Sequence, residues 1–202
     1  MIGIVDYGVG NLFSLRSSFS VIGVETPVSG DPDVILSWDK IILPGVGAFG
    51  DAADKLRAFG LTDVLREEAR KGKPFLGICL GMQLLLEKSY EYGEHDGLAL
   101  IPGSVVPMAD KLPVGLKVPH IGWNALHMTR PHPLLAGVSE GDCVYFVHSY
   151  YADGCGDALI AETEYGIPLT AAVAKENVMG CQFHPEKSGK VGLSILSAFC
   201  GL

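Results

Sequence analysis

Three side chains in this sequence have the types and spacing needed for acyl transfer, and the first of them is Cys79. It lies within Gly77-x-Cys79-x-Gly81, directly after the apolar run Pro74–Ile78 and before a second apolar run. This pattern predicts a nucleophile elbow, the sharp strand-to-helix turn that lifts a reactive side chain out of a parallel sheet. Both glycines are expected because a Cβ at these positions would clash with neighbouring backbone. A thiol at the start of a helix also faces unpaired N–H groups, which favour the nucleophilic thiolate. The alternative is that Cys79 is a small apolar core residue.

A cysteine nucleophile needs a general base, and the base needs a group that orients it. Of the six histidines, His184 is the best candidate, because it is followed by Pro185 and Glu186 near the end of a predicted strand. Proline favours an extended backbone in the residue before it, and residues two apart in an extended segment point to the same side. We therefore expect Glu186 to lie beside the His184 imidazole and to hold its tautomer. The alternatives are a simple strand terminator, or half of a metal site with Cys181. The sequence offers no second half, so no metal is expected.

Acyl transfer also needs N–H donors for the tetrahedral oxyanion. The N–H of Leu80, the residue after the nucleophile, is one expected donor. A second donor usually comes from a loop after a neighbouring strand. The glycine-rich run Pro44–Gly50 follows the apolar run Lys40–Leu43, and within it Val46 and Gly47 are the candidates.

The elements that must position these groups alternate between strand and helix in the first half of the chain, which predicts a parallel, doubly wound core. Close-spaced apolar runs in the second half predict an antiparallel extension. We therefore expect a mixed α/β fold with flanking helices and a mostly parallel sheet, formed as a single domain over residues 1–202. The predicted strands are 2–5, 24–28, 40–43, 74–78, 119–128, 143–151, 158–163, 169–174 and 178–183, while residues 98–108 and 114–118 are short segments interrupted by turns. The predicted helices are 12–21, 49–72, one starting directly after Cys79, and 188–200; residues 90–97 are expected to be a loop.

Composition and charge exclude several classes of function. The 202 residues are 48% hydrophobic and 19% charged, with a net charge of −8, and no basic stripe predicts nucleic-acid binding. The longest uncharged apolar run, Pro74–Leu86, is too short to span a bilayer. The chain starts directly with a predicted core strand and shows no signal peptide. Its five scattered cysteines favour reduced thiols, so a cytoplasmic location is expected.

Two glycine-rich turns resemble nucleotide sites only in part. Gly8-x-Gly10 follows the first strand, but Phe13 occupies the position where a dinucleotide fingerprint needs a small residue. The Pro44–Gly50 run lacks the Gly-Lys-Ser/Thr ending of a phosphate-binding loop. No cofactor is therefore expected.

Taken together, these motifs resemble the class I (triad) glutamine amidotransferases, and the resemblance covers the whole chain. It is closest to the branch of that family that serves histidine biosynthesis, although Ile121 stands where methionine is common. The matching motifs are Asp6-Tyr-Gly-Val-Gly-Asn11, Pro44-Gly-Val-Gly-Ala-Phe49, Gly77-Ile-Cys-Leu-Gly-Met-Gln83, Pro119-His-Ile-Gly-Trp-Asn124, Tyr145-Phe-Val-His-Ser-Tyr150 and Phe183-His-Pro-Glu-Lys-Ser-Gly189.

The resemblance implies a reaction and a partner. Cys79 would attack the side-chain amide of L-glutamine, release ammonia and form a glutamyl thioester that water hydrolyses to glutamate. Gln83, Ser149 and Tyr150 match positions near the bound glutamine in the family. The ammonia would pass to a separate (β/α)8-barrel cyclase subunit in a heterodimer, which makes imidazole glycerol phosphate and an aminoimidazole carboxamide ribonucleotide.

The partner is expected to dock near the carboxyl edge of the sheet. Asn11, Trp123 and Lys187 are the candidate contacts, because each is polar or amphipathic and adjoins one of the motifs; the alternative for Trp123 is a core position. Three other functions are compatible with parts of the pattern. They are the glutaminase subunit of another class I enzyme, such as those of pyridoxal-phosphate or purine synthesis, a cysteine peptidase on a related fold, and a non-catalytic interaction module.

Overall fold

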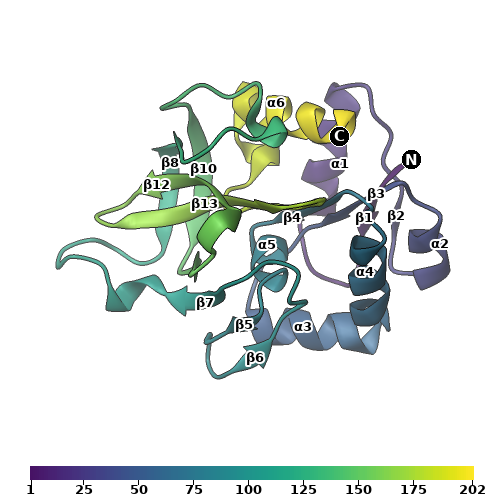
Figure 1. The fold of residues 1–202 in the computed structure, drawn as a ribbon, viewed down its shortest axis with the longest axis horizontal. Coiled ribbons are helices and arrows are strands. Elements are labelled where there is room, and N and C mark those ends of the chain that lie inside the picture. The colour runs from purple at the N-terminus through teal and green to yellow at the C-terminus, as the bar shows by residue number, and fades with distance from the viewer.

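The computed structural model describes residues 1–202, and an eight-stranded sheet runs through its centre (Figure 1). The strand order is β2-β1-β3-β4-β14-β13-β12-β9. These strands are β1 (Ile2–Val5), β2 (Val28–Ser29), β3 (Lys40–Leu43), β4 (Phe75–Ile78), β9 (His127–Met128), β12 (Leu159–Glu164), β13 (Pro168–Lys175) and β14 (Val178–Cys181). The five strands from β2 to β14 are mutually parallel, while β13, β12 and β9 continue the sheet in antiparallel pairs. The predicted mixed, mostly parallel α/β architecture is therefore confirmed.

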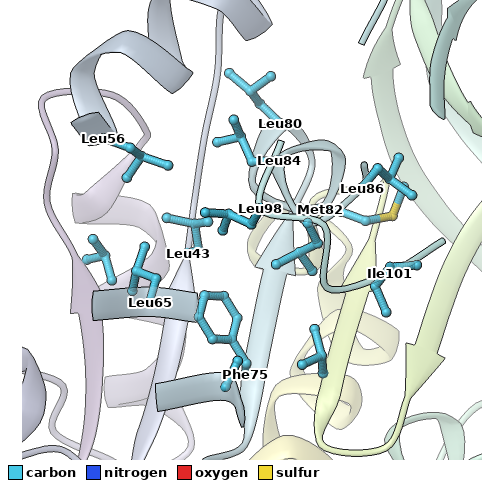
Figure 2. Packing of buried hydrophobic residues seen from close by; sticks show 14 of the residues in the cluster. Leu43, Leu56, Leu65, Phe75, Leu80, Met82, Leu84, Leu86, Leu98 and Ile101 are labelled. Atoms are coloured by element: carbon cyan, nitrogen blue, oxygen red, sulfur yellow. The ribbon is translucent and has the colours of Figure 1, made fainter. Parts of the chain in front are cut away.

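The parallel strands are short apolar runs without alternation, as expected for strands that are covered on both faces. Every residue of β1 and β4 is buried. Helices α1 (Leu12–Val21) and α6 (Gly189–Gly201) cover one face, and α3 (Phe49–Ala58), α4 (Leu61–Arg70) and α5 (Leu80–Leu84) cover the other (Figure 1). The short helix α2 (Pro32–Leu36) begins at Asp31, whose carboxylate accepts a hydrogen bond from the N–H of Asp33. Figure 2 shows Leu43 and Phe75 of the sheet packed among Leu56, Leu65 and Leu84 of the covering helices.

Two smaller sheets extend the molecule beyond β14. One pairs β8 (His120–Ala125) with β10 (Cys143–His148), and the other has the order β11-β7-β5-β6. Its strands are β5 (Lys88–Ser89), β6 (His95–Asp96), β7 (Ser104–Pro107) and β11 (Tyr150–Asp153). The prediction of one strand over 143–151 is wrong, because the chain leaves β10 at Ser149 and enters a different sheet as β11. Ser149 thus joins the two small sheets.

Several predicted elements are shorter than expected or divided. The helix predicted over 49–72 is two helices, which are separated at Gly60, where φ is +68°. The strand predicted at 24–28 reduces to the two residues of β2, and the strand predicted at 119–128 is divided into β8 and β9, which belong to different sheets. The loop predicted at 90–97 contains the two-residue β6. No helix combines the length and the apolar character that crossing a membrane requires.

Candidate active site

Cys79 occupies a strained turn at the carboxyl end of β4. Its φ of +54° is unusual for a residue with a side chain, and its N–H donates to the Cys181 carbonyl at 2.8 Å. A Cβ at Gly81 would lie 1.8 Å from the carbonyl oxygen of Leu43, and one at Gly77 would lie 2.7 Å from the Gly81 carbonyl oxygen. Both glycines are therefore required by close backbone contacts, as the elbow interpretation predicted.

The helix that follows the elbow is shorter than a strong dipole effect would need. It spans only Leu80–Leu84, and the effect of a helix dipole grows with the number of aligned peptides. A direct donor lies closer to the thiol, since Gln182 Nε2 approaches Cys79 Sγ at 3.7 Å. Cys79 is 7% exposed. The Gln182 amide therefore contacts the nucleophile directly.

His184 lies three residues after β14, the sheet neighbour of β4, so the parallel register brings it beside Cys79. Its Nδ1 lies 2.7 Å from Glu186 Oε1, and both side chains are almost completely buried. The expected contact is present, but its geometric reason differs from the prediction. Only His184 is extended, while Pro185–Lys187 form a turn of 3-10 helix that brings the carboxylate back onto the imidazole.

The electrostatics of His184 favour the charged imidazolium. Burial alone lowers the pKa of His184, but contact with Cys79 and Glu186 outweighs burial and raises that pKa to about 10. The Nε2 atom of His184 is buried and forms no hydrogen bond. Cys79 nevertheless lies close enough to the ring to raise the pKa of His184. This arrangement suits a proton that is held next to the sulfur and can be transferred to a leaving group.

A cleft of about 340 Å³ opens in front of Cys79 and His184, a size that suits a small ligand. Most of the predicted site residues line this cleft together, namely Val46, Gly47, Leu80, Gln83, Ser149, Tyr150 and Lys187. The N–H groups of Val46, Gly47 and Leu80 form no hydrogen bond within the chain. Three donors from two loops therefore remain free to bind a ligand oxygen.

Sequence reasoning missed two polar side chains of the cleft, Glu91 and His148. Glu91 is the one acidic residue in the cleft lining; its Oε2 accepts a 2.6 Å hydrogen bond from the N–H of Phe49. Burial raises the pKa of Glu91, while the Phe49 bond opposes that shift. The only sequence signal was a glutamate between two tyrosines in a polar segment, and such a pattern is also typical of a solvated loop.

Tyr7 gives the first glycine-rich turn a structural role. The Tyr7 side chain is fully buried, and its hydroxyl donates to the Pro44 carbonyl at 2.8 Å. A Cβ at Gly45 would lie 2.8 Å from the same hydroxyl and 2.9 Å from the Gly81 nitrogen. The Asp6–Asn11 turn thus holds the loop that carries Val46 and Gly47 against the elbow.

The candidate partner contacts lie outside or at the rim of the cleft. Trp123 is 57% exposed, so the alternative core position is wrong; its ring lies edge-on to Tyr145, with centroids 6.2 Å apart. Lys187 lies at the rim of the cleft, with its Nζ 5.7 Å from the centre of the Tyr145 ring. Asn11 is exposed and caps α1 by accepting a hydrogen bond from the N–H of Ser14.

Comparison with known proteins places the chain among amidotransferases. The family model "Glutamine amidotransferase class-I" matches residues 4–200. The "Imidazole glycerol phosphate synthase subunit HisH" of Caldanaerobacter subterraneus subsp. tengcongensis is 50% identical over 200 residues, which cover 98% of this chain and 97% of the relative. The protein of the same description from Sulfurimonas denitrificans is 52% identical over 202 residues, which cover 98% and 97%.

Solved structures share the fold at low sequence identity. A crystal structure described as a glutamine amidotransferase superposes with a TM-score of 0.76 at 18% identity and covers 100% of this chain and 99% of that chain. The structure of PurLQS from Thermotoga maritima superposes with a TM-score of 0.74 at 18% identity and covers 99% and 97%. These likenesses support the architecture alone.

Proposed function

The chain belongs to the class-I glutamine amidotransferase family, and we propose on this basis that it is the glutaminase subunit of an imidazole glycerol phosphate synthase. It hydrolyses L-glutamine to L-glutamate and ammonia and supplies the ammonia for histidine biosynthesis. The observation that carries this proposal is the convergence of Cys79 and the buried His184–Glu186 pair from the adjacent strands β4 and β14 on one cleft.

In the first half of the proposed reaction, the Cys79 thiolate attacks the carboxamide carbon of glutamine. The C=O π electrons move to the oxygen, which accepts hydrogen bonds from the Leu80 N–H and from an N–H of Val46 or Gly47. Collapse of this intermediate breaks the C–N bond while the His184 imidazolium donates its Nε2 proton to the nitrogen. Ammonia leaves, and a glutamyl thioester remains on Cys79.

In the second half, the now neutral His184 acts as the general base. It takes a proton from water as the oxygen attacks the thioester carbon, and the same N–H donors stabilise the second oxyanion. The C–S bond breaks, glutamate leaves, and thiolate and imidazolium are restored. Glu186 stabilises the imidazolium in both halves through its 2.7 Å contact with Nδ1.

The cleft offers groups of suitable charge for the rest of the substrate. We assign the α-ammonium of glutamine to Glu91, because it is the one carboxylate lining the cleft and one of its oxygens is already held by the Phe49 N–H. Gln83, Ser149 and Tyr150 are the proposed substrate contacts on the other walls. Gln83 is itself fixed, since its Nε2 donates to the Tyr150 carbonyl at 3.1 Å and to Gln182 Oε1 at 2.9 Å.

The proposed partner is the (β/α)8-barrel cyclase subunit, which docks near the mouth of the cleft. Trp123 and Ile121 of β8, the latter 58% exposed, present apolar surface to it, and Lys187 lies near the same Tyr145 ring as Trp123. Asn11 extends this candidate contact set. We further propose that docking aligns the loop of Val46 and Gly47, where Gly47 has a φ of +97°, and so switches on glutamine hydrolysis. Residues 1–202 are proposed to be one domain, and the proposed location is the cytoplasm.

The test uses the complex with the cyclase subunit. Cys79→Ser is expected to abolish glutamine-dependent product formation and to preserve the ammonium-dependent reaction, because only the source of ammonia is lost. Cys143→Ser is the matched control, since Cys143 is an exposed thiol outside the cleft. Release of glutamate at the wild-type rate by the Cys79→Ser complex would refute the assignment. Hydrolysis of casein by the isolated chain would favour a peptidase instead.

A further inference from the structure

A buried pair of histidines lies at the wall of the cleft, to whose lining His148 contributes, and no step of the proposed reaction uses it. His120 on β8 and His148 on β10 face each other directly across the antiparallel pair, with His120 Nδ1 3.1 Å from His148 Nε2. Both side chains are nearly inaccessible, at 2% and 6% exposure. A neutral histidine is costly to bury unless both of its ring nitrogens form hydrogen bonds.

Every ring nitrogen of the pair has a partner, and the partners determine the direction of each hydrogen bond. His148 Nδ1 lies 2.8 Å from the Tyr150 carbonyl oxygen, which can only accept, so Nδ1 carries the proton. A neutral His148 then accepts at Nε2 from His120 Nδ1–H. His120 Nε2 in turn accepts from Asn124 Nδ2 at 3.4 Å, and the Asn124 amide is oriented by its 2.7 Å donation to the Glu164 carbonyl. The donors thus run in one direction from Asn124 to Tyr150.

The neutral state that this chain of donors requires fits the surroundings of both rings. Burial lowers the pKa of His148 to about 3, although the bond to the Tyr150 carbonyl opposes it, and burial lowers the pKa of His120 to about 4. His120 is also stacked between Phe146 and Tyr165, at centroid distances of 4.9 and 4.2 Å. Both rings therefore remain uncharged, and both are expected to be protonated at Nδ1.

The last acceptor in this series of hydrogen bonds is the carbonyl of Tyr150, next to Ser149. Ser149 and Tyr150 line the cleft at the point where the polypeptide leaves β10 and enters β11 of another sheet. The Tyr150 carbonyl accepts from both His148 Nδ1 and Gln83 Nε2. We propose that His120 and His148 are positioning residues for glutamine hydrolysis, which hold the Ser149–Tyr150 segment in the geometry that binds glutamine. This inference rests on the proposed glutaminase function.

Substitutions of His148 and His120 can distinguish a role in positioning the Ser149–Tyr150 segment from a role in core packing alone. His148→Leu removes the donor to Tyr150, whereas the side-chain amide of His148→Asn places a nitrogen near the Nδ1 position and can restore it. His120→Phe keeps the stack with Phe146 and Tyr165 but breaks the chain of donors. Thr163→Val is the matched control, because Thr163 is fully buried and its hydroxyl donates to the Ala125 carbonyl at 2.8 Å, away from the cleft.

Glutamate release by the cyclase complex is measured for each variant, together with its melting temperature. We expect His148→Leu and His120→Phe to raise KM for glutamine about tenfold, a factor that equals about 1.4 kcal/mol, with a smaller change in kcat. His148→Asn should recover most of the KM, and Thr163→Val should lower stability without changing KM. If the histidine variants lose stability but keep the wild-type KM, or if His148→Asn binds glutamine no better than His148→Leu, the pair has a structural role only and the proposal is overturned.

A second measurement does not depend on glutamine turnover. Nitrogen-15 NMR of the wild-type complex should show both imidazoles neutral and protonated at Nδ1. A proton on Nε2 of either ring would overturn the proposal, because the chain of donors would then be broken. If wild-type protein released no glutamate while both rings showed the Nδ1–H form, the proposed function would be wrong and the hydrogen-bond chain would still stand.

Discussion

Replacing Glu186 by glutamine removes one charge from the triad while leaving its shape almost unchanged. The side-chain amide oxygen of Glu186→Gln can still accept a hydrogen bond from His184 Nδ1, so the tautomer is retained. What is lost is the attraction between two buried charges whose atoms lie 2.7 Å apart. A hydrogen bond to a charged group contributes about 1.5–3 kcal/mol and a neutral one about 0.5–1.5 kcal/mol. The substitution should therefore destabilise the His184 imidazolium by about 1.4 kcal/mol, which lowers the pKa of His184 by about one unit.

The pH dependence follows from the raised pKa of His184, about 10 compared with an ordinary 6.5. The imidazolium that donates a proton to ammonia is present below this pKa and is lost above it, so wild-type activity should decline as pH rises through about 10. In Glu186→Gln the decline should begin about one pH unit lower. Stability changes in the same sense: a folded-state pKa above the unfolded value adds stability that is complete below pH 6.5 and lost as pH rises through 10.

The assay is glutamate release by the cyclase complex across the alkaline range, with ammonium-dependent synthesis as an internal control. Glu140→Gln is the matched control. Glu140 Oε1 also lies 2.7 Å from a histidine nitrogen, Nδ1 of His127, but both side chains of this pair are more than half exposed. Glu140→Gln should leave the pH profile unchanged. An unshifted alkaline decline in Glu186→Gln, or lower activity than in His184→Ala, would refute the role assigned to the carboxylate.

Four further outcomes are expected. His184→Ala should reduce glutamine hydrolysis nearly as much as loss of the thiol, because members of a catalytic unit act together; single-turnover kinetics measures this. Gly81→Ala should distort the elbow and reduce the rate of Cys79 alkylation by a glutamine-like reagent, since its Cβ would lie 1.8 Å from a carbonyl oxygen. Glu91→Gln should raise KM for glutamine about tenfold or more with less effect on kcat, because it removes the counter-charge proposed for the α-ammonium. Trp123→Ala combined with Lys187→Ala should weaken cyclase binding in a titration and leave the fold intact.

The parts of the site that lie close together in sequence could be predicted from it. Gly77, Cys79 and Gly81 define one turn, for which local rules of backbone geometry were sufficient. The contact between His184 and Glu186 was also expected, although a 3-10 turn produces it and an extended segment does not. The parallel order of β4 and β14 then brought the two turns together. The loop of Val46 and Gly47 could also be placed at the cleft, because a glycine-rich loop after a strand is itself a local signal. The oxyanion role of its N–H groups stays a prediction.

The missed features depend on contacts between distant segments. Glu91 is held at the cleft by the N–H of Phe49, 42 residues earlier in the chain. The strand break at Ser149 was invisible, since the alternation of Val144, Phe146 and His148 continues up to it. The division between α3 and α4 at Gly60 was hidden by an apolar pattern that runs through both helices. Pairing between distant segments determined the first two outcomes, while the left-handed conformation of Gly60 is a local signal that the apolar pattern masked.

The close contacts around the elbow also limit how this sequence can change over evolutionary time. A Cβ at Gly45 would lie 2.9 Å from the nitrogen of Gly81, and a Cβ at Gly81 would run into the Leu43 carbonyl. A larger residue at Gly81 meets backbone atoms, so no substitution in a neighbouring side chain can make room for it. The loop after β3 and the turn after β4 therefore constrain each other, and a change of backbone path in one requires a matching change in the other.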